Sequence, residues 1–389
     1  MMNKQLEKPF EYLRRKKETG NEEGKKFESE IVNNWYKARA FVLSKLEKIA
    51  FEPNDSSHLH IMIKGDNPLM LSVVRQVALT THYLNFDEEN EEEEKRKRTV
   101  ITLESSKKIN EIIYELKKEE YLNNLLDYCK YSTNEGTFNK DSYIDIEFRI
   151  VNKLPNEDVG NPNELVFKEE DVISFCELKT KEELYNIDTR KAQYAGRTYD
   201  LAKLIENLPA ENIHDAVRYT LALNTFQYNK LQEPLGSLIE ESKWNKDQIK
   251  VKNGLSNIFC ADCFDSKVKS IELCRKDKKQ KYSLLWAENN EFLCKSEHAR
   301  WVVEKLIMGF RPLNDNERID DEKLSPYEKK RELYRDNLKN DTEKLAHIDL
   351  CSYTNLRRVN PEHMKYDSFL MLAIPLIYET LQNENNIIR

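Results

Sequence analysis

A group of polar and aromatic residues in the last quarter of the chain has side chains that suit nucleotide binding. His298, Arg300 and Trp301 fall within one helical turn, and His347 and Tyr353 follow on a separate segment. An arginine offers a planar pair of donors to a phosphate or carboxylate, and a tryptophan or tyrosine can stack on a base. The residue types therefore predict a pocket for a nucleotide-like ligand.

The same residues also have a structural interpretation, in which they form a polar core between helices. Trp301 would then be a packing anchor, and His298 would hydrogen-bond to Asp367 or to the backbone, because buried polar groups need partners. Apolar residues at helical spacing predict a helix from Ser283 to Met308, which Gly309 would end as a left-handed cap. The sequence leaves both interpretations open.

The spacing of these residues resembles the RyR domain, the small helical repeat of ryanodine receptors that also occurs in bacterial proteins. The family pattern runs E-H-x-R-W, then a Gly-aromatic-Arg step, then a later His, Leu, Tyr and Leu, and an acidic residue before a final apolar helix. The matching residues are Glu297, His298, Arg300, Trp301, Gly309, Phe310, Arg311, His347, Leu350, Tyr353, Leu356 and Asp367. The resemblance implies ligand sensing by a site framed by His298, Arg300, Arg311, His347 and Tyr353.

A second candidate site follows an apolar segment in the first third of the chain. The turn Gly65-Asp66-Asn67 leads from a predicted strand into a predicted helix, with Asn67 as N-cap. A Rossmann-type site places a pyrophosphate at such a turn. Only one glycine of the three-glycine fingerprint is present, and Asp66 would repel a phosphate, so NAD binding is doubtful. Glu104, after the next strand, could hold a ribose hydroxyl or be an ordinary strand-end charge.

Bacterial RyR-domain proteins often carry a Rossmann-like domain similar to TrkA-type potassium-transport regulators, and this chain resembles that layout. The resemblance rests on the aromatic-rich step from His82 to Phe86 and on Ser256-Asn257 and Ala261-Asp262. It implies an α/β plus α fold, in which a Rossmann-like parallel sheet precedes a helical RyR domain. The expected divisions are a helical segment 1–57, a Rossmann-like domain 58–190, a helical connector 191–282 and an RyR-type domain 283–389.

The hydrophobic pattern predicts alternating strands and helices followed by helices alone, which is typical of the start of a doubly wound sheet. The predicted strands are Leu59–Ile63, Thr99–Leu103, Tyr143–Val151 and Val172–Cys176. The predicted helices are Asn34–Phe51, Leu69–Leu79, Lys107–Lys130, Arg190–Glu206, Ala210–Gln227, Ser256–Leu273 and Ser283–Met308. Leu154–Asn163 reads as a loop, and the charged run Asp87–Arg98 predicts a solvated surface loop.

Composition limits the function classes. A net charge of −7 over 389 residues argues against a protein that coats nucleic acid. No segment has the apolar length of a membrane helix, the first residues lack the apolar core of a signal peptide, and seven cysteines show no disulfide framework. We therefore expect a cytoplasmic protein. Cys260 and Cys263, with Cys294 and His298 downstream, make a zinc site arithmetically possible, although helical spacing favours ordinary buried cysteines.

No motif of a known reaction is present, so the sequence favours a binding protein over an enzyme. The first hypothesis is a cytosolic sensor of a nucleotide or nucleotide-derived signal, in a bacterial signalling or defence setting by resemblance. It would act on a protein effector or as a homo-oligomer. The second hypothesis is a nucleotide-processing enzyme that uses Asp66, Glu104 or Glu177 at the carboxyl ends of the strands. The third is a non-catalytic interaction scaffold.

Overall fold

A computed structural model shows where these elements lie. It describes residues 34–35, 37–46, 48–118, 122–152, 164–177, 259–260, 262–275, 282–313, 345–364, 366–368, 371 and 374. The helices predicted at Arg190–Glu206 and Ala210–Gln227 and the loop predicted at Leu154–Asn163 lie outside the described residues.

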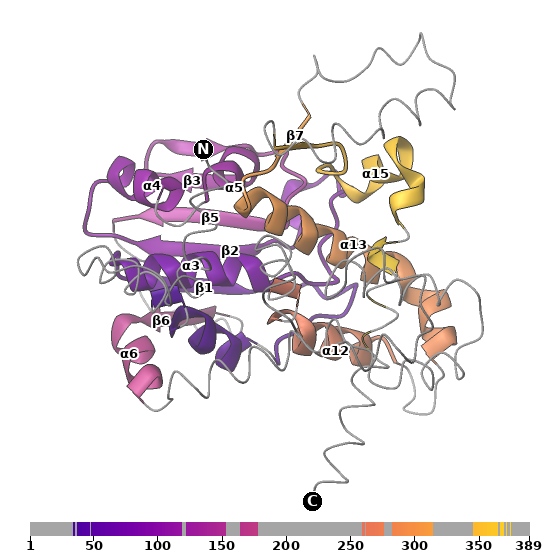
Figure 1. The fold of residues 1–389 in the computed structure, drawn as a ribbon, viewed down its shortest axis with the longest axis horizontal. Coiled ribbons are helices and arrows are strands. Elements are labelled where there is room, and N and C mark those ends of the chain that lie inside the picture. Colours follow the sequence, from indigo (N-terminus) through magenta and orange to yellow (C-terminus); the bar gives the residue numbers. More distant parts are fainter. Residues whose placement is uncertain are drawn as a thin grey trace, which may run out of the picture.

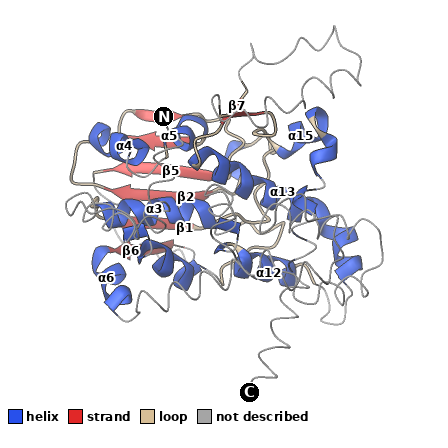
Figure 2. Cartoon of the chain, in the orientation of Figure 1, coloured by secondary structure: helices blue, strands red, loops and turns tan. Residues whose placement is uncertain are grey.

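A mostly parallel sheet forms the centre of the described molecule (Figures 1 and 2). Its strands are β1 (His60–Lys64), β2 (Thr99–Glu104), β3 (Lys130–Thr133), β4 (Gly136–Phe138), β5 (Ile146–Val151) and β6 (Glu164–Lys168). Their order is β4-β3-β5-β2-β1-β6, and only the β3–β4 pair is antiparallel. The order reverses between β1 and β6, as at the switch point of a doubly wound fold. The predicted α/β class is confirmed.

Helices surround the sheet and continue beyond it. They are α3 (Pro68–Thr80), α4 (Ile109–Lys118), α5 (Asn123–Tyr128), α6 (Glu169–Glu177), α12 (Phe264–Leu273), α13 (Tyr282–Ile307) and α15 (Tyr353–Val359). The short strands β7 (Arg311–Pro312) and β8 (Ala346–His347) pair in parallel. Among the described residues, no helix has both the length and the apolar character needed to cross a membrane.

The step from β1 to α3 follows the sequence prediction closely. Asn67 has an extended backbone and its Oδ1 accepts a hydrogen bond from the Met70 amide at 3.0 Å, while Pro68 is the first helical residue. Gly65 has φ +127°, a conformation that favours glycine, and an added Cβ would lie 3.1 Å from Met70 Cγ. Local turn and cap signals therefore determined this element. Every residue of α3 from Leu69 to Thr80 is buried.

Other predictions need correction. The strand predicted at Val172–Cys176 is wrong, because these residues lie in α6 and the strand is β6, immediately before it. Three acidic residues open α6, where negative charge stabilises a helix, and a short apolar run does not distinguish strand from helix. The helix predicted at Lys107–Lys130 is instead α4 and α5, and Lys130 already belongs to β3. The β3–β4 hairpin was missed.

The long helix α13, predicted as Ser283–Met308, packs against α3 and α5. Val302, Val303 and Leu306 belong to the same buried cluster as Ile61 of β1 and Phe148 of β5. Gly309 has φ +87° and ends the helix, as predicted. In Figure 1 the orange and yellow helices α12, α13 and α15 lie on the side opposite the arrowheads of β2 and β5. The carboxyl-terminal helices therefore adjoin the amino-terminal edge of the sheet.

A buried polar joint connects three distant segments. The Arg39 guanidinium donates to both carboxylate oxygens of Asp262, with Nε–oxygen distances of 2.8 and 2.7 Å, and the Gln76 amide donates to the same carboxylate at 2.8 Å. These residues come from the helical residues 37–46, from α3 and from the segment before α12. Because each charged group here has a partner, the joint can lie in the interior without an isolated charge.

Candidate functional site

The residues predicted to bind a ligand form two groups at opposite edges of the sheet. Gly65 and Glu104 lie at the carboxyl ends of β1 and β2, where the Gly65 amide donates to the Glu104 carbonyl at 3.3 Å. Helix α13 lies at the other edge, where Ser296 Oγ donates to the carbonyl of His82, beyond the end of α3, at 3.0 Å. The structure brings the members of each group together but keeps the groups apart.

At the carboxyl edge, the side chain of Asp66 is engaged by its own neighbours. Its Oδ2 accepts hydrogen bonds from Ser105 Oγ at 2.8 Å and from the amide and hydroxyl of Ser106 at 2.8 and 3.0 Å. Lys107 Nζ donates to the Asp66 carbonyl at 3.1 Å. Burial opposes ionisation, but the hydrogen bonds from Ser105 and Ser106 lower the pKa of Asp66 below its usual value. Asp66 therefore joins two loops as an ionised acceptor.

This arrangement bears on both hypotheses that use the carboxyl edge. Asn67 caps α3 from within, so the helix end predicted to meet a pyrophosphate is partly satisfied by the chain itself. Glu104 is partly buried at the end of β2, while Glu177 closes α6 and its side chain lies outside the described set. The geometry here favours the structural interpretation of the strand–turn–helix.

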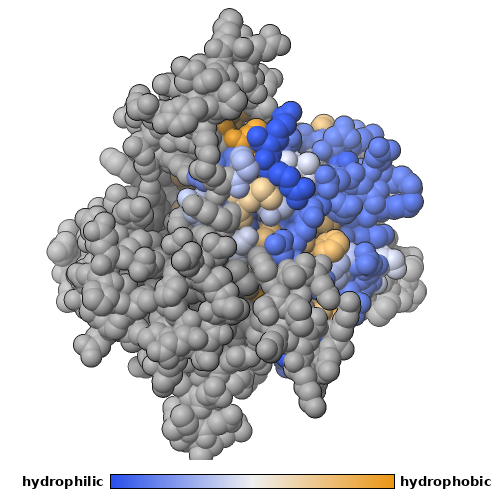
Figure 3. All heavy atoms as spheres, turned by 90° about the vertical axis from the view of Figure 1, so that its right-hand side faces the viewer, coloured by the Kyte–Doolittle hydropathy of each residue, from blue (hydrophilic) through white to orange (hydrophobic). Residues whose placement is uncertain are grey.

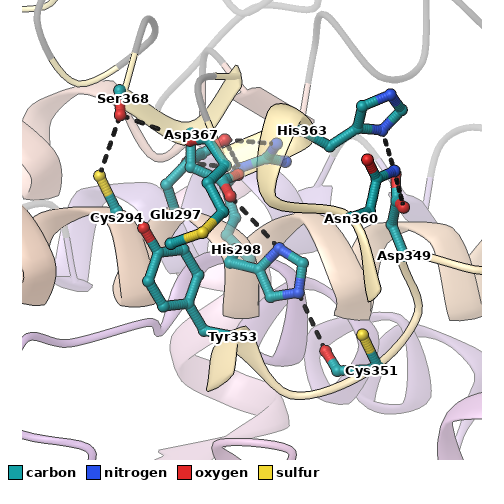
Figure 4. A network of polar contacts seen from close by, with 12 residues as sticks. Cys294, Glu297, His298, Asp349, Cys351, Tyr353, Asn360, His363, Asp367 and Ser368 are labelled. Atoms are coloured by element: carbon teal, nitrogen blue, oxygen red, sulfur yellow. Dashed lines mark hydrogen bonds and ion pairs between the residues drawn. The ribbon is translucent and has the colours of Figure 1, made fainter. Parts of the chain in front are cut away.

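At the amino edge, His298 forms a buried ion pair (Figure 4). Its Nδ1 lies 3.3 Å from Asp367 Oδ2, and its Nε2 donates to the carbonyl of Cys351 at 2.9 Å. Only 3% of His298 is exposed. Burial disfavours the charged ring, but the Asp367 carboxylate and the two hydrogen bonds outweigh it and hold the pKa of His298 well above its usual value. The partner anticipated for His298 is therefore the one observed.

Arg300 is also an interior residue. Its Nε and Nη2 donate to Glu297 at 2.9–3.0 Å, and its Nη1 donates to Glu304. Lys267 of α12 pairs with Glu297 from the other side. Burial opposes ionisation of Glu297, but Arg300 and Lys267 lower its pKa below the usual value. The guanidinium predicted to bind phosphate is thus occupied by two carboxylates, in a charge chain that alternates in sign.

Tyr353 completes the interior group. It is buried at the start of α15, where Ser352 caps the helix by accepting a hydrogen bond from the Asn355 amide. Its ring meets the His298 ring edge-on, with centroids 5.7 Å apart. Burial raises the pKa of Tyr353 above its usual value. Of the predicted RyR-type site, His298, Arg300 and Tyr353 therefore face inward.

The remaining predicted residues gather at a partly exposed surface, which we call the aromatic cluster: Trp301, Phe310, Arg311 and His347. Trp301 and His347 meet edge-on at 5.0 Å between centroids, and Phe310 lies 6.3 Å from His347. The pairing of β7 with β8 places Arg311 beside this group, and Lys305 Nζ lies 5.8 Å from the Trp301 ring. Partly exposed aromatic rings beside cationic groups can stack on a base and pair with an anion.

Sequence reasoning missed a second polar centre next to this cluster. Asp349 accepts hydrogen bonds from Asn360 Nδ2 at 2.7 Å and His363 Nδ1 at 2.6 Å, as Figure 4 shows. The Asp349 amide donates to His347 Nδ1 at 3.2 Å. Asp349 therefore sets the orientation of two histidines. The signal available in the sequence was its position two residues after His347.

The charged run Asp87–Arg98 is a surface loop, as its composition predicted, but several of its charges contact distant segments. Glu88 accepts hydrogen bonds from the amides of Tyr353 and Thr354, and Glu89 pairs with Lys295 at 3.0 Å. Arg98 is 2% exposed and bonds to the carbonyls of Ser142 and Ile144. These charges have complementary partners far along the chain, which local composition cannot show.

The cysteines considered for a zinc site are free thiols in the interior of the protein. Cys260 and Cys263 are buried, burial raises the pKa of both thiols, and Cys263 Sγ donates to the Leu79 carbonyl at 3.3 Å. Within the described part of the chain, no set of three or more His, Cys, Asp or Glu residues is placed to hold a metal ion. The thiols here act as small buried side chains.

Comparison of the chain with family models gave no match. Comparison with curated proteins and with solved structures also gave none. The resemblance to RyR-domain proteins therefore stays a prediction, and the function has to be argued from the geometry.

Proposed function

We propose that this chain is a regulatory protein that binds a nucleotide or nucleotide-derived ligand at the aromatic cluster and relays binding to the sheet through α13. The observation that carries the proposal is the division within one helix. Trp301 faces the partly exposed cluster, while Arg300, one residue before it, and His298 are held in the interior by carboxylates. This division assigns ligand contact to the outer residues and support to the inner ones.

The chemistry of the cluster suits such a ligand. Trp301 and Phe310 offer rings to a base, and Arg311 offers positive charge to a phosphate, whereas Lys305 is paired with Glu304. Arg311 Nη1 donates to the Pro312 carbonyl at 3.0 Å, which fixes the orientation of the guanidinium at the cluster. His347 stands between the rings and is oriented by the Asp349 amide.

A ligand bound here would act on a helix that is part of the main core. Beyond Trp301, α13 continues through Val302, Val303 and Leu306, which share a buried cluster with α3 and the sheet. Asn124 of α5 donates to the Phe310 carbonyl at 2.7 Å. A displacement of the cluster would therefore change the packing of both α13 and α5. A sensor requires such a connection between its ligand site and the rest of the fold.

The test is thermal unfolding against a nucleotide panel that includes NAD, ADP-ribose, ATP and cyclic oligonucleotides. A ligand at 100 times its Kd should stabilise the protein by about 2.7 kcal/mol, which raises Tm by a few degrees. The variant Arg311→Ala should abolish the shift. The matched control is Arg357→Ala, because Arg357 is an exposed arginine on α15 that pairs with Glu291.

The outcomes separate the three hypotheses. A shift lost in Arg311→Ala and kept in Arg357→Ala supports the proposal. A shift lost only in Glu104→Gln would move the ligand to the carboxyl edge of the sheet. Turnover of a nucleotide that fails in Glu104→Gln would favour the enzymatic alternative. No shift with any nucleotide would sink the proposal and leave the scaffold as the better explanation.

A further inference from the structure

The acidic segment Asp87–Glu89 holds the chain that leads into α15. The Glu88 carboxylate accepts hydrogen bonds from the amides of Tyr353 and Thr354, at 3.1 and 2.8 Å. Lys295 of α13 lies 3.0 Å from Glu89 and 3.7 Å from Asp87. Hydrogen bonds from Thr354 and Lys295 lower the pKa of Glu89 below its usual value. More than 200 residues separate the two sides of this contact in the sequence.

A small cleft lies directly behind this segment. Its lining includes Phe86, Glu88, Tyr143, Lys295, His298 and Cys351. The volume that the centres of water molecules can reach is about 10 Å³, which leaves room for about one water. The face that Figure 3 shows, the right-hand side of Figure 1, is mostly hydrophilic where described residues are visible, with isolated hydrophobic spots.

Two kinds of contact hold residues 350–354, the segment whose Cys351 forms one wall of the cleft. Tyr143 Oη donates to the Leu350 carbonyl at 3.0 Å, and His298 donates to the Cys351 carbonyl at 2.9 Å. Glu88 holds the other end of this wall through two amides. The His298 contact is internal, whereas the side chains of Asp87 and Glu89 are each 50% exposed. Exposed ion pairs are screened by salt and interior ones much less.

We propose that Asp87–Glu89 is a releasable latch that closes the cleft, and that its release opens a path from solvent to the buried His298. Removing the Glu88 charge or screening it frees the residues around Tyr353 while the internal contact of His298 keeps the rest of the wall in place. The cleft is lined by aromatic and aliphatic side chains and by Lys295. The latch does not depend on the function proposed above.

Cys351 reports directly on the state of this cleft. It is partly exposed and lines the cleft, whereas the other cysteines with described side chains are buried. The experiment measures the rate at which N-ethylmaleimide alkylates Cys351 in the folded full chain, by mass spectrometry of its peptide. Glu88→Gln should raise this rate about tenfold, as expected when a charged hydrogen bond that opposes opening is lost. Wild-type protein in 1 M NaCl should show an increase in the same direction, because salt screens the exposed ion pairs of the latch.

The matched control is Glu92→Gln, a change in the same charged segment. Glu92 pairs with Lys95 three residues away, and both side chains are exposed. Its substitution should leave the Cys351 rate unchanged. Cys129, which follows α5, serves as an internal reference because it is fully buried in the core around the sheet, away from Tyr353. An unchanged Cys351 rate in Glu88→Gln would overturn the latch, and so would a parallel rise at Cys129, which indicates general unfolding.

Discussion

The two edges of the sheet are built by different means. At the carboxyl edge, the Asp66 side chain accepts hydrogen bonds from hydroxyl and amide groups of a single neighbouring loop, the one that follows β2. At the amino edge, Lys267, Glu297, Arg300 and Glu304 form a buried chain of alternating charge that joins two helices. In doubly wound folds, ligands usually bind at the carboxyl edge. Here the buried charge chain lies at the amino edge instead. It supports α13, the helix that carries Trp301 of the proposed site.

The largest expected effect comes from breaking the charge chain at the amino edge. Arg300→Ala leaves the carboxylates of Glu297 and Glu304 in the interior without their main partner. Such a change costs about 3–5 kcal/mol of unfolding free energy, because an uncompensated charge remains buried. Urea unfolding followed by circular dichroism measures this loss. A loss no greater than that of the exposed control Arg357→Ala would contradict the internal role of Arg300.

A second prediction concerns pH and the ion pair of His298. Because the folded pKa of His298 lies well above the unfolded value of about 6.5, the pair stabilises the protein fully below that value. This contribution is lost as pH rises through the folded pKa. We expect the wild-type Tm to fall on the alkaline side, and Asp367→Asn to remove that part of the pH dependence. Tm measured from pH 6 to 10 tests this. Parallel Tm curves for the two proteins would show that the pair contributes nothing.

At the carboxyl edge the same kind of change should cost less. Asp66→Asn removes a carboxylate oxygen that accepts hydrogen bonds from several neutral donors. We expect this change to lower the free energy of unfolding by about 1–3 kcal/mol. Since the pKa of Asp66 is lowered in the folded state, its contribution is present above the unfolded value and is lost as pH falls through the folded pKa. Urea unfolding at pH 7 and at pH 3 should show a smaller difference between wild type and variant in acid. An equal difference at both values would refute the ionised role of Asp66.

The smallest effect is expected at the surface of the amino edge. Glu89→Gln removes a half-exposed partner of Lys295, and exposed pairs contribute about 0–1 kcal/mol. Any loss seen at low salt should disappear in 1 M NaCl. Chemical unfolding at both salt concentrations measures it. A loss as large as that of Arg300→Ala would contradict the distinction between exposed and buried charges at the amino edge.

Features that depend on neighbouring residues in the sequence were predicted better than contacts between distant segments. The turn at Gly65, the Asn67 cap and the end of α13 at Gly309 were correct, because each depends on residues within a few positions. The Arg300 partners were not predicted as such, although they lie three and four residues away on the same helix. Glu88 could not be found at all, since its partners at Tyr353 and Thr354 come from a distant segment.

The site prediction divides in the same way. The sequence identified residue types that suit a nucleotide, and the structure places Trp301, Arg311 and His347 at one surface. The sequence could not show that Arg300 and His298 are enclosed by carboxylates. Spacing groups these residues on the faces of a helix but does not reveal which polar face is buried. The prediction of a strand at Val172–Cys176 failed for a related reason. In so short an apolar run, periodicity does not distinguish a strand from a helix.

The complete burial of α3 has a consequence for dividing the protein. In an open α/β sheet one side of such a helix normally meets solvent, but here α13 packs against it and supplies Val302, Val303 and Leu306 to the shared core. A fragment cut before α13 would leave apolar side chains of α3 in water, and the excised helices would lose the surface on which they rest. We therefore expect that the carboxyl-terminal quarter is not a detachable module. Each of the two fragments should aggregate when expressed alone, and they should regain solubility only when produced together.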